Sequence, residues 1–266
     1  MKNEEIFQFE NITYSIVDVF RREIRVGTGI FNESIPNAVN ASYSGQLLIP
    51  NFITYSNKLL RVTEIGTCAF VYCQSITSVR VGYNVEVVRQ QAFFRCRNIV
   101  NITFEKNSLL KTLENACFYD LYAVESIEFG CDKLQTIGDW VFGYTFVLKN
   151  IRFPASVKFM DQRSLRGMFT LERIDYCSKS AVTKDVFYRG EPDEHITPTN
   201  LIIKVTTGYG SSTFGINDNI DIDDSINCYF PPAISDNDLN CRTIYGKNDY
   251  RIAYSLVCVF ILMYDS

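Results

Sequence analysis

The sequence predicts a solenoid, in which short repeats stack on one another and share one continuous hydrophobic core. Three observations predict this fold: apolar columns that recur every 23–25 residues, alternation of apolar and polar positions inside each unit, and a composition of 47% hydrophobic and 21% charged residues. Such a composition is typical of a folded chain. One unit is too short to bury its own apolar side, so we expect neighbouring units to cover it.

The repeat is clearest when the chain is aligned on Phe70, Phe93, Phe118, Phe142 and Leu165, which are 23, 25, 24 and 23 residues apart. Four further columns are apolar in every unit. The column five positions before the anchor contains Ile65, Val88, Leu113, Ile137 and Met160, and the column six positions after it contains Ile76, Ile99, Val124, Leu148 and Leu171. The column nine positions after the anchor contains Val79, Ile102, Ile127, Ile151 and Ile174, and the column eleven positions after it contains Val81, Phe104, Phe129, Phe153 and Tyr176. Columns filled at a fixed period predict five stacked units.

Each unit is expected to contain one main strand. The columns nine and eleven residues after the anchor lie two apart, so they share one face of a strand such as residues 76–81. The segment around the anchor, for example Ala69-Phe70, is too short and mixed for a full helix and predicts a helical turn that drives the Phe inward. Residues such as 85–88 predict a second, shorter extended piece.

The flanking segments are expected to close the two ends of the stack, because an open apolar end would aggregate. We assign residues 1–58 to an N-terminal β-rich cap, 59–176 to five repeats, and 177–232 to a degenerate last repeat and C-terminal cap. Within these, residues 208–250 have a loop-like composition. The tail, 233–266, contains an apolar run at 252–264, which is shorter than the ~17–25 residues of a bilayer span. It predicts a packed strand or helix, with a truncated membrane anchor as the alternative.

Several chemistries are disfavoured by composition. A net charge of -4 gives no general attraction for nucleic acid. The single histidine, His195, excludes sites with paired histidines, and no nucleophile accompanies it. The acidic stretch 218–224 lacks the Gly and Glu of a calcium-binding EF-hand loop, so we expect a solvated surface loop. No catalytic residue, metal or cofactor is predicted.

The nine cysteines do not have the spacing of a disulfide framework, and no CxxC pair occurs. Cys73 and Cys96 occupy one column in adjacent units and could in principle form a disulfide, but we expect buried free thiols, which pack well in a core. The first residues are acidic where a secretory signal is basic, so no cleavable signal is visible.

The first unit contains a recognisable pattern, Ile65-Gly66-x-x-Ala69-Phe70-x-x-Cys73-x-x-Ile76-x-x-Val79-x-Val81. It resembles the repeat of BspA-like leucine-rich-repeat proteins over about residues 45–176. The later units depart from it, since Leu121, Thr145 and Met168 replace the cysteine. The resemblance implies a leucine-rich-repeat solenoid of the α/β horseshoe type, built mainly of short β-strands with short helical turns. It also implies a cell-surface antigen or adhesin, because such proteins bind host matrix proteins or other cells.

The outward face of the main strands is the candidate partner-binding surface, because repeat solenoids present such faces to proteins. The alternative is that Glu128, Arg152 and Asp175 only pair with one another across neighbouring strands. The ten candidate residues, eight and ten positions after each anchor, are Ser78, Arg80, Asn101, Thr103, Ser126, Glu128, Asn150, Arg152, Arg173 and Asp175.

The sequence therefore predicts a non-enzymatic binding module that recognises a host or matrix protein, or a glycan, through its strand face. Nucleic acid is not expected as a partner, and membrane association is expected only through the apolar tail. The cell surface is the location that the resemblance implies. The alternative is an intracellular scaffold of the same fold that binds a cytosolic protein.

Overall fold

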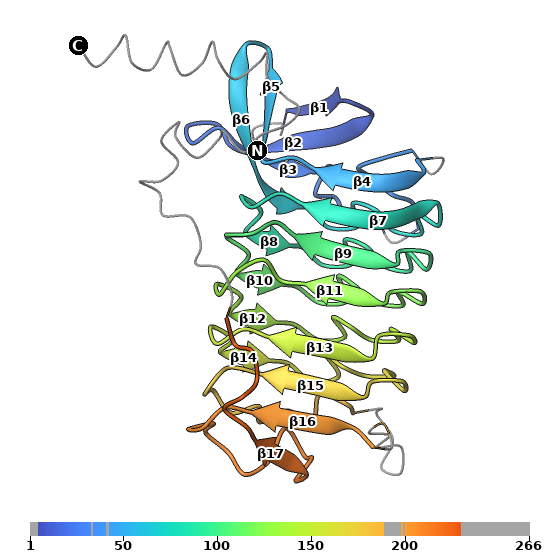
Figure 1. Ribbon diagram of the computed structural model, residues 1–266. Coiled ribbons are helices and arrows are strands. Elements are labelled where there is room, and N and C mark those ends of the chain that lie inside the picture. The colour runs from blue at the N-terminus through green and yellow to red at the C-terminus, as the bar shows by residue number, and fades with distance from the viewer. Residues whose placement is uncertain (1–4, 33, 41–42, 189–197, 199, 230–266) are drawn as a thin grey trace, which may run out of the picture. The chain divides into compact units, whose positions relative to one another are not determined.

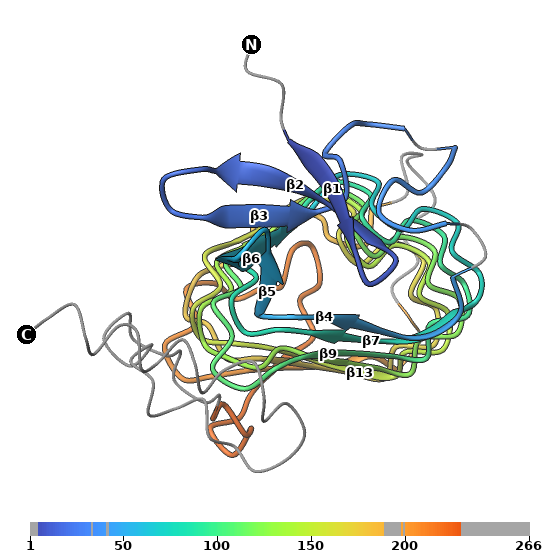
Figure 2. The same ribbon diagram turned by 90° about the horizontal axis from the view of Figure 1, so that it is seen from above.

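A computed structural model describes residues 5–32, 34–40, 43–188, 198 and 200–229, which lie within one compact unit. They form a coil of short strands arranged in three sheets, stacked rung upon rung (Figure 1). Seen along the stack, successive rungs superimpose around one core (Figure 2). The predicted solenoid is confirmed.

The first sheet joins the N-terminal hairpins to a row of two-residue strands. Its order is β1 (Ile6–Phe9), β2 (Ile12–Asp18), β3 (Glu23–Val26), β6 (Lys58–Ile65), β8 (Val87–Val88), β10 (Thr112–Leu113), β12 (Thr136–Ile137) and β14 (Phe159–Met160), with β5 (Phe52–Tyr55) paired to β6. The pairs from β6 to β14 are parallel, as expected when each rung is one turn of the same coil.

The main strands form the other two sheets. One contains β4 (Gly45–Ile49), β7 (Ile76–Val81), β9 (Asn101–Phe104) and β11 (Ser126–Glu128). The other contains β13 (Asn150–Phe153), β15 (Arg173–Tyr176), β16 (Ile202–Val205) and β17 (Ile220–Ile222). All of these pairs are parallel as well. β17 lies inside residues 208–250, so the loop prediction was wrong for this strand.

The aligned columns coincide with the register of the strands. Val79 pairs with Ile102 and Ile102 with Ile127, while Leu113 pairs with Ile137 in the first sheet. Every residue of the five columns is buried, with at most 9% of its surface exposed. The anchor rings stack directly: the centroids of Phe93 and Phe118 are 5.6 Å apart. The core is therefore a set of side-chain ladders that run through the rungs.

The anchor segments are turns, and no helix occurs in the described residues, so the helical turns expected there are absent. The cause is two left-handed residues in every unit, two before and two after the anchor, which interrupt any α-helix. In the third unit these are Ala116 (φ 55°) and Asp120 (φ 57°). Their amides donate to the next rung instead: Ala116 N–H to Asp139 O at 2.9 Å and Asp120 N–H to Gly143 O at 2.7 Å.

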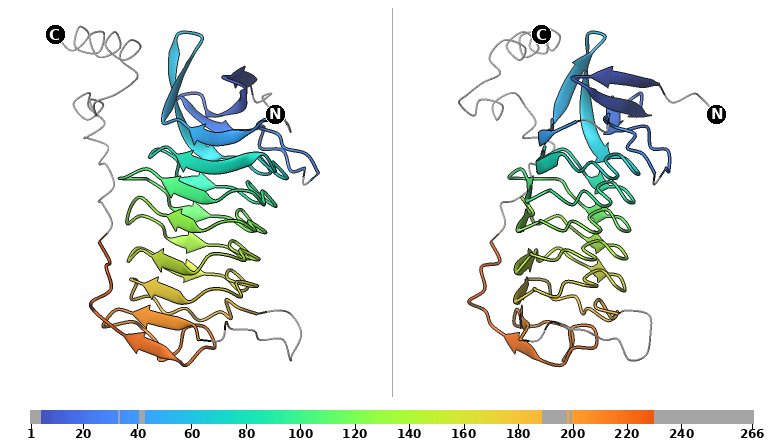
Figure 3. Two further views of the ribbon diagram at one scale, coloured as in Figure 1. Left: turned by 45° about the vertical axis from the view of Figure 1, so that its right-hand side comes forward. Right: turned by 90° about the vertical axis from the view of Figure 1, so that its right-hand side faces the viewer.

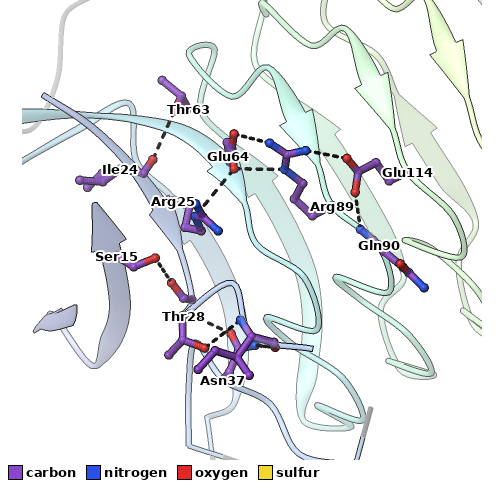
Figure 4. A network of polar contacts seen from close by, with 12 residues as sticks. Ser15, Ile24, Arg25, Thr28, Asn37, Thr63, Glu64, Arg89, Gln90 and Glu114 are labelled. Carbon is purple, nitrogen blue, oxygen red and sulfur yellow. Dashed lines mark hydrogen bonds and ion pairs between the residues drawn. The ribbon is translucent and has the colours of Figure 1, made fainter. Parts of the chain in front are cut away.

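A chain of ion pairs links the cap to the first rungs (Figure 4). Glu64 of β6 lies 3.8 Å from Arg25 of β3 and accepts hydrogen bonds from Arg89, at 2.6 and 3.1 Å, which also donates to Glu114 at 2.7 Å. These bonds to Glu64 and Glu114 raise the pKa of Arg89. Each carboxylate and guanidinium thus bridges neighbouring rungs.

The predicted segment limits at residues 58, 176 and 232 stay predictions. Strand pairing crosses the limits at 58 and 176. β4 already pairs with β7, and β16 continues the sheet of β15. The tail, including the apolar run at 252–264, lies outside the described residues.

Truncating one anchor ring should destabilise the whole stack. Phe118 is fully buried between Phe93 and Phe142, at 5.6 and 6.2 Å. We expect Phe118→Ala to lower the free energy of unfolding by about 3–5 kcal/mol, because it leaves a cavity between rungs. Urea denaturation followed by circular dichroism measures this, with Phe118→Leu as the milder control. A loss below about 1 kcal/mol would contradict the ladder.

At the left-handed turn positions, introducing a glycine should stabilise the protein and removing one should destabilise it. Ala116→Gly is expected to raise the free energy of unfolding by up to about 1 kcal/mol, because glycine adopts positive φ without steric cost. Gly167→Ala should lower it by more, since φ is 74° and an added Cβ would lie 2.6 Å from the Tyr144 ring. The same urea measurement tests both, and equal effects of like sign would refute this account of the turns.

Candidate partner-binding surface

The strand face, meaning the outward side chains of β7, β9, β11, β13 and β15, contains all ten predicted residues in two rows. In the first half of the strand face, formed by β7, β9 and β11, Ser78 pairs with Asn101 and Asn101 with Ser126. In the same half, Arg80 pairs with Thr103 and Thr103 with Glu128. In the other half, Asn150 pairs with Arg173 and Arg152 with Asp175. All ten side chains are exposed or half-buried. The structure therefore places the predicted residues on neighbouring main strands, whose stacking Figure 1 shows.

The first half of this face is polar and only partly self-paired. Ser126 Oγ donates to Asn101 Oδ1 at 2.7 Å, and Arg80 binds Glu105 at 2.9 Å although its side chain remains 60% exposed. Glu128 is exposed and, in the described part of the chain, has no ion-pair partner. This half thus offers hydrogen-bonding groups and one uncompensated carboxylate.

The second half is more strongly engaged by the chain itself. Arg173 Nε donates to Asp175 Oδ1 at 2.6 Å on its own strand, and Arg152 donates to the Asn227 carbonyl at 3.0 Å. β11 and β13 are neighbours in the stack without being hydrogen-bonded to each other, so the rows break between Glu128 and Arg152. The simple alternation of Glu128, Arg152 and Asp175 that we considered therefore does not describe these contacts.

Sequence reasoning missed the two ends of the face. Gln46 and Leu48 of β4 continue the rows in register with Ser78 and Arg80, and Leu48 is 47% exposed. At the other end, Lys204 of β16 follows Asp175. Alternation in residues 45–49 was the available signal, but we assigned this segment to the N-terminal cap.

The cysteines of the described residues fall into two groups. Cys73 and Cys96 are buried free thiols, as predicted, and so are Cys117 and Cys131, while Cys68 is buried and is not part of a disulfide. Burial raises the pKa of Cys73 to about 12 and that of Cys131 to about 11.

The second group is a disulfide that the sequence did not predict. It joins Cys177, directly after β15, to Cys228, with a Cα–Cα distance of 5.5 Å. It fastens the segment after β17 back onto the body of the stack.

The acidic stretch 218–224 is held by a lysine. Lys204 contacts Asp223 and lies 3.8 Å from Asp221, and its hydrogen bond lowers the pKa of Asp223. Over the described residues, no group of three potential metal ligands occurs. Nor does the described part contain a helix long and apolar enough to cross a bilayer. His195 lies outside the described residues.

Parallel in-register rungs, a buried anchor ladder and one polar strand face define a leucine-rich-repeat module. A family model for the BspA type leucine rich repeat region matches residues 62–191 in six copies. The repeat region of this chain therefore belongs to the BspA-type leucine-rich-repeat family. The matched residues extend beyond the five predicted units into the segment predicted as a degenerate last repeat.

Solved structures agree on the fold. The chain is similar to a leucine-rich-repeat protein of T. pallidum, with 20% identity, a TM-score of 0.58, and coverage of 76% of this chain and 85% of that one. It is also similar to the pneumococcal vaccine antigen PcpA, with 23% identity and a TM-score of 0.60; the match covers 79% of this chain but 52% of that one. No curated protein matches the chain. At these identities the likeness shows the fold alone.

The buried thiols should resist alkylation in the folded protein. We expect iodoacetamide at about pH 8 to leave Cys73, Cys96 and Cys117 unmodified, because burial both raises their pKa and blocks access. Peptide mapping by mass spectrometry checks this, and the same reaction in urea with reductant serves as the control. Cys177 and Cys228 should react only after reduction. Rapid labelling of Cys96 in the native protein would contradict the burial described above.

Proposed function

We propose that this chain is a non-enzymatic protein-binding module that acts at the cell surface, as an antigen or adhesin that recognises a host or matrix protein through its strand face. The observation that carries the proposal is the pair of polar rows, which are in register across β7, β9 and β11 and whose side chains are exposed or half-buried. Leucine-rich repeats typically serve as binding scaffolds. Affinity on such a surface comes from many contacts arranged in rows rather than from one pocket.

The centre of the strand face is the best starting point for a partner. Thr103, Glu128 and Asn101 lie on two adjacent strands, and Glu128 is not neutralised within the described residues. A partner that supplies a cation there gains an interaction without breaking an existing ion pair. At Arg173, by contrast, a partner must compete with Asp175.

The disulfide supports a location outside the reducing cytosol. Cys177 and Cys228 are separated by 51 residues, so their bond removes much chain entropy from the unfolded state. Disulfides of this structural kind persist mainly in exported proteins. One similar structure is that of a vaccine antigen, which agrees with the same location.

The second candidate is an intracellular scaffold that uses the same face on a cytosolic protein. The five buried free thiols are compatible with a reducing compartment. Fractionation of the native source, with the redox state of Cys177 measured in each fraction, separates the two. A reduced pair in the cytosolic fraction would favour the scaffold.

The role of the strand face can be tested with charge reversal at its centre. We expect Thr103→Arg combined with Glu128→Arg to weaken binding to immobilised host matrix proteins or host cells by about tenfold or more, because the contacts there are central. Surface plasmon resonance and cell-binding assays measure this.

Lys158→Glu provides the matched control, because Lys158 is exposed and lies directly before β14, in the other sheet. It should bind like the unaltered chain. Circular dichroism should show that both variants are folded. Equal binding by the double variant and the unaltered chain would exclude the strand face as the recognition surface.

A further inference from the structure

A second continuous surface runs along the anchor turns, which lie between the short strands of the first sheet and the main strands. Figure 3 turns this side of the stack toward the viewer in its right-hand panel. It is an aromatic ridge composed of Tyr72, Phe94, Tyr119, Trp140, Tyr144 and Phe146. The ridge contains the only tryptophan of the chain. Sequence reasoning did not find it, because its rings occupy different columns in different units.

The rings contact one another from unit to unit. Tyr72 and Phe94 are 6.0 Å apart between centroids, Phe94 and Tyr119 are stacked at 5.0 Å, and Tyr119 and Tyr144 are 5.5 Å apart. Phe146 lies 5.8 Å from Tyr144. The ridge is therefore one packed object that crosses four rungs rather than scattered exposed rings.

Two glycines shape the backbone for these rings. A Cβ at Gly143 would lie 3.0 Å from both Trp140 and Tyr119, and a Cβ at Gly167 would lie 2.6 Å from Tyr144. In the other units the equivalent positions carry larger residues. The rings are thus held against the backbone in fixed positions, which lowers the entropy that binding must overcome.

The lower end of the ridge is apolar and open to solvent. Phe146 contacts Tyr122 at 4.9 Å and Phe169 at 5.8 Å. Tyr122 is 55% and Phe169 is 37% exposed. Neighbouring exposed rings of this kind are typical of interaction sites.

Four arginines lie beside the rings, whereas among the described residues only two carboxylates, those of Asp120 and Asp139, form ion pairs with them. Arg97 binds Asp120 at 2.6 Å and Arg163 binds Asp139 at 2.6 Å, so those two charges are compensated. Arg166 lies 4.2 Å above the Trp140 ring, and within the described residues no carboxylate pairs with it. Its Nε is buried and has no hydrogen-bond partner.

Arg95 is similar, because its Nε is also buried without a hydrogen bond. Its guanidinium lies 5.1 Å above the Phe94 ring and 3.5 Å from Asp120. The Phe94 ring under Arg95 and the Trp140 ring under Arg166 both contact the Tyr119 ring, at 5.0 and 5.5 Å between centroids. Both guanidinium groups therefore lie over rings that are neighbours of Tyr119.

We propose that the aromatic ridge is a second protein-docking surface, distinct from the strand face, and that it binds an acidic segment of a partner protein. A partner carboxylate accepts hydrogen bonds from Arg166 and Arg95, and a neighbouring apolar side chain packs on Tyr122 and Phe169. Charge complementarity carries this choice, since no carboxylate of the described residues pairs with Arg166.

A protein segment is favoured over an acidic glycan by the state of the tryptophan. Two guanidinium groups, of Arg166 and Arg163, already lie over the Trp140 ring at 4.2 and 5.3 Å. The flat indole face that a sugar ring would stack on is thus engaged. Tryptophan, tyrosine and arginine together are the residues that dominate protein–protein hot spots.

The test is selection of a random peptide library on the immobilised full chain. Enriched peptides are synthesised with a fluorescent label and titrated against the unaltered chain, Arg166→Gln, Arg166→Lys and Tyr122→Ala. We expect enrichment of Asp and Glu beside aromatic or aliphatic residues. Arg166→Gln should weaken binding by about tenfold or more, because a charge-assisted hydrogen bond is lost. Arg166→Lys should restore only part of it, since lysine lacks the planar fork.

Arg21→Gln is the matched control, because it removes an exposed arginine from the turn between β2 and β3, outside both surfaces, and should leave peptide binding unchanged. Within the part of the chain that the structure describes, Arg166 has no ion pair to lose, so circular dichroism should show that its variants are folded. If one of them does not fold, Arg95→Gln provides a second test. Failure to enrich acidic peptides, or equal binding by Arg166→Gln, overturns the proposal. Binding of hyaluronan oligosaccharides that depends on Arg166, with no peptide selected, also overturns it and assigns the ridge to an acidic glycan.

Discussion

The structure depends on the stacking of rungs that have no core of their own. The Phe93 and Phe118 rings meet at 5.6 Å across a rung boundary, and the residues of all five columns are covered in the same way. Strands about 4.8 Å apart then repeat every outward side chain along a row. The stacking that buries the interior therefore also orders the surface, because residues at the same repeat position in successive rungs form a row along the stack.

The turns show how this constraint overrides local preference. Non-glycine residues such as Cys68, Gln91 and Ala116 adopt positive φ in successive units, each at a cost of about 1 kcal/mol. The anchor amides gain in return: Phe93 N–H donates to Cys117 O of the next rung at 2.9 Å. Because residues on both sides of the anchor are left-handed, every second amide of this segment points toward the neighbouring rung. A helix would direct them along its own axis and leave the rungs unlinked.

Periodic features could be predicted from sequence and singular ones could not. The buried columns and both rows of the strand face recur in every unit, so spacing alone located them, and Ser78, Asn101 and Ser126 lie in register as expected. The Cys177–Cys228 disulfide and strand β17 occur once, in the part of the chain after β15 where the period of the repeats is lost. The break between β11 and β13 is likewise singular. The left-handed turns were missed for another reason, because residues such as Gln91 give no compositional sign of positive φ.

The two surfaces differ in how much of their polarity the chain already satisfies. On the strand face, Arg80 is bound by Glu105 and Arg173 by Asp175, so a partner there must replace existing bonds or use the few free groups around Glu128. On the aromatic ridge, Arg166 is stacked and fixed but lacks a carboxylate among the described residues. A preorganised donor whose partner is missing contributes more to binding than one that must first be released. If both surfaces bind proteins, the strand face suits broad, tolerant recognition, whereas the ridge suits one defined acidic group.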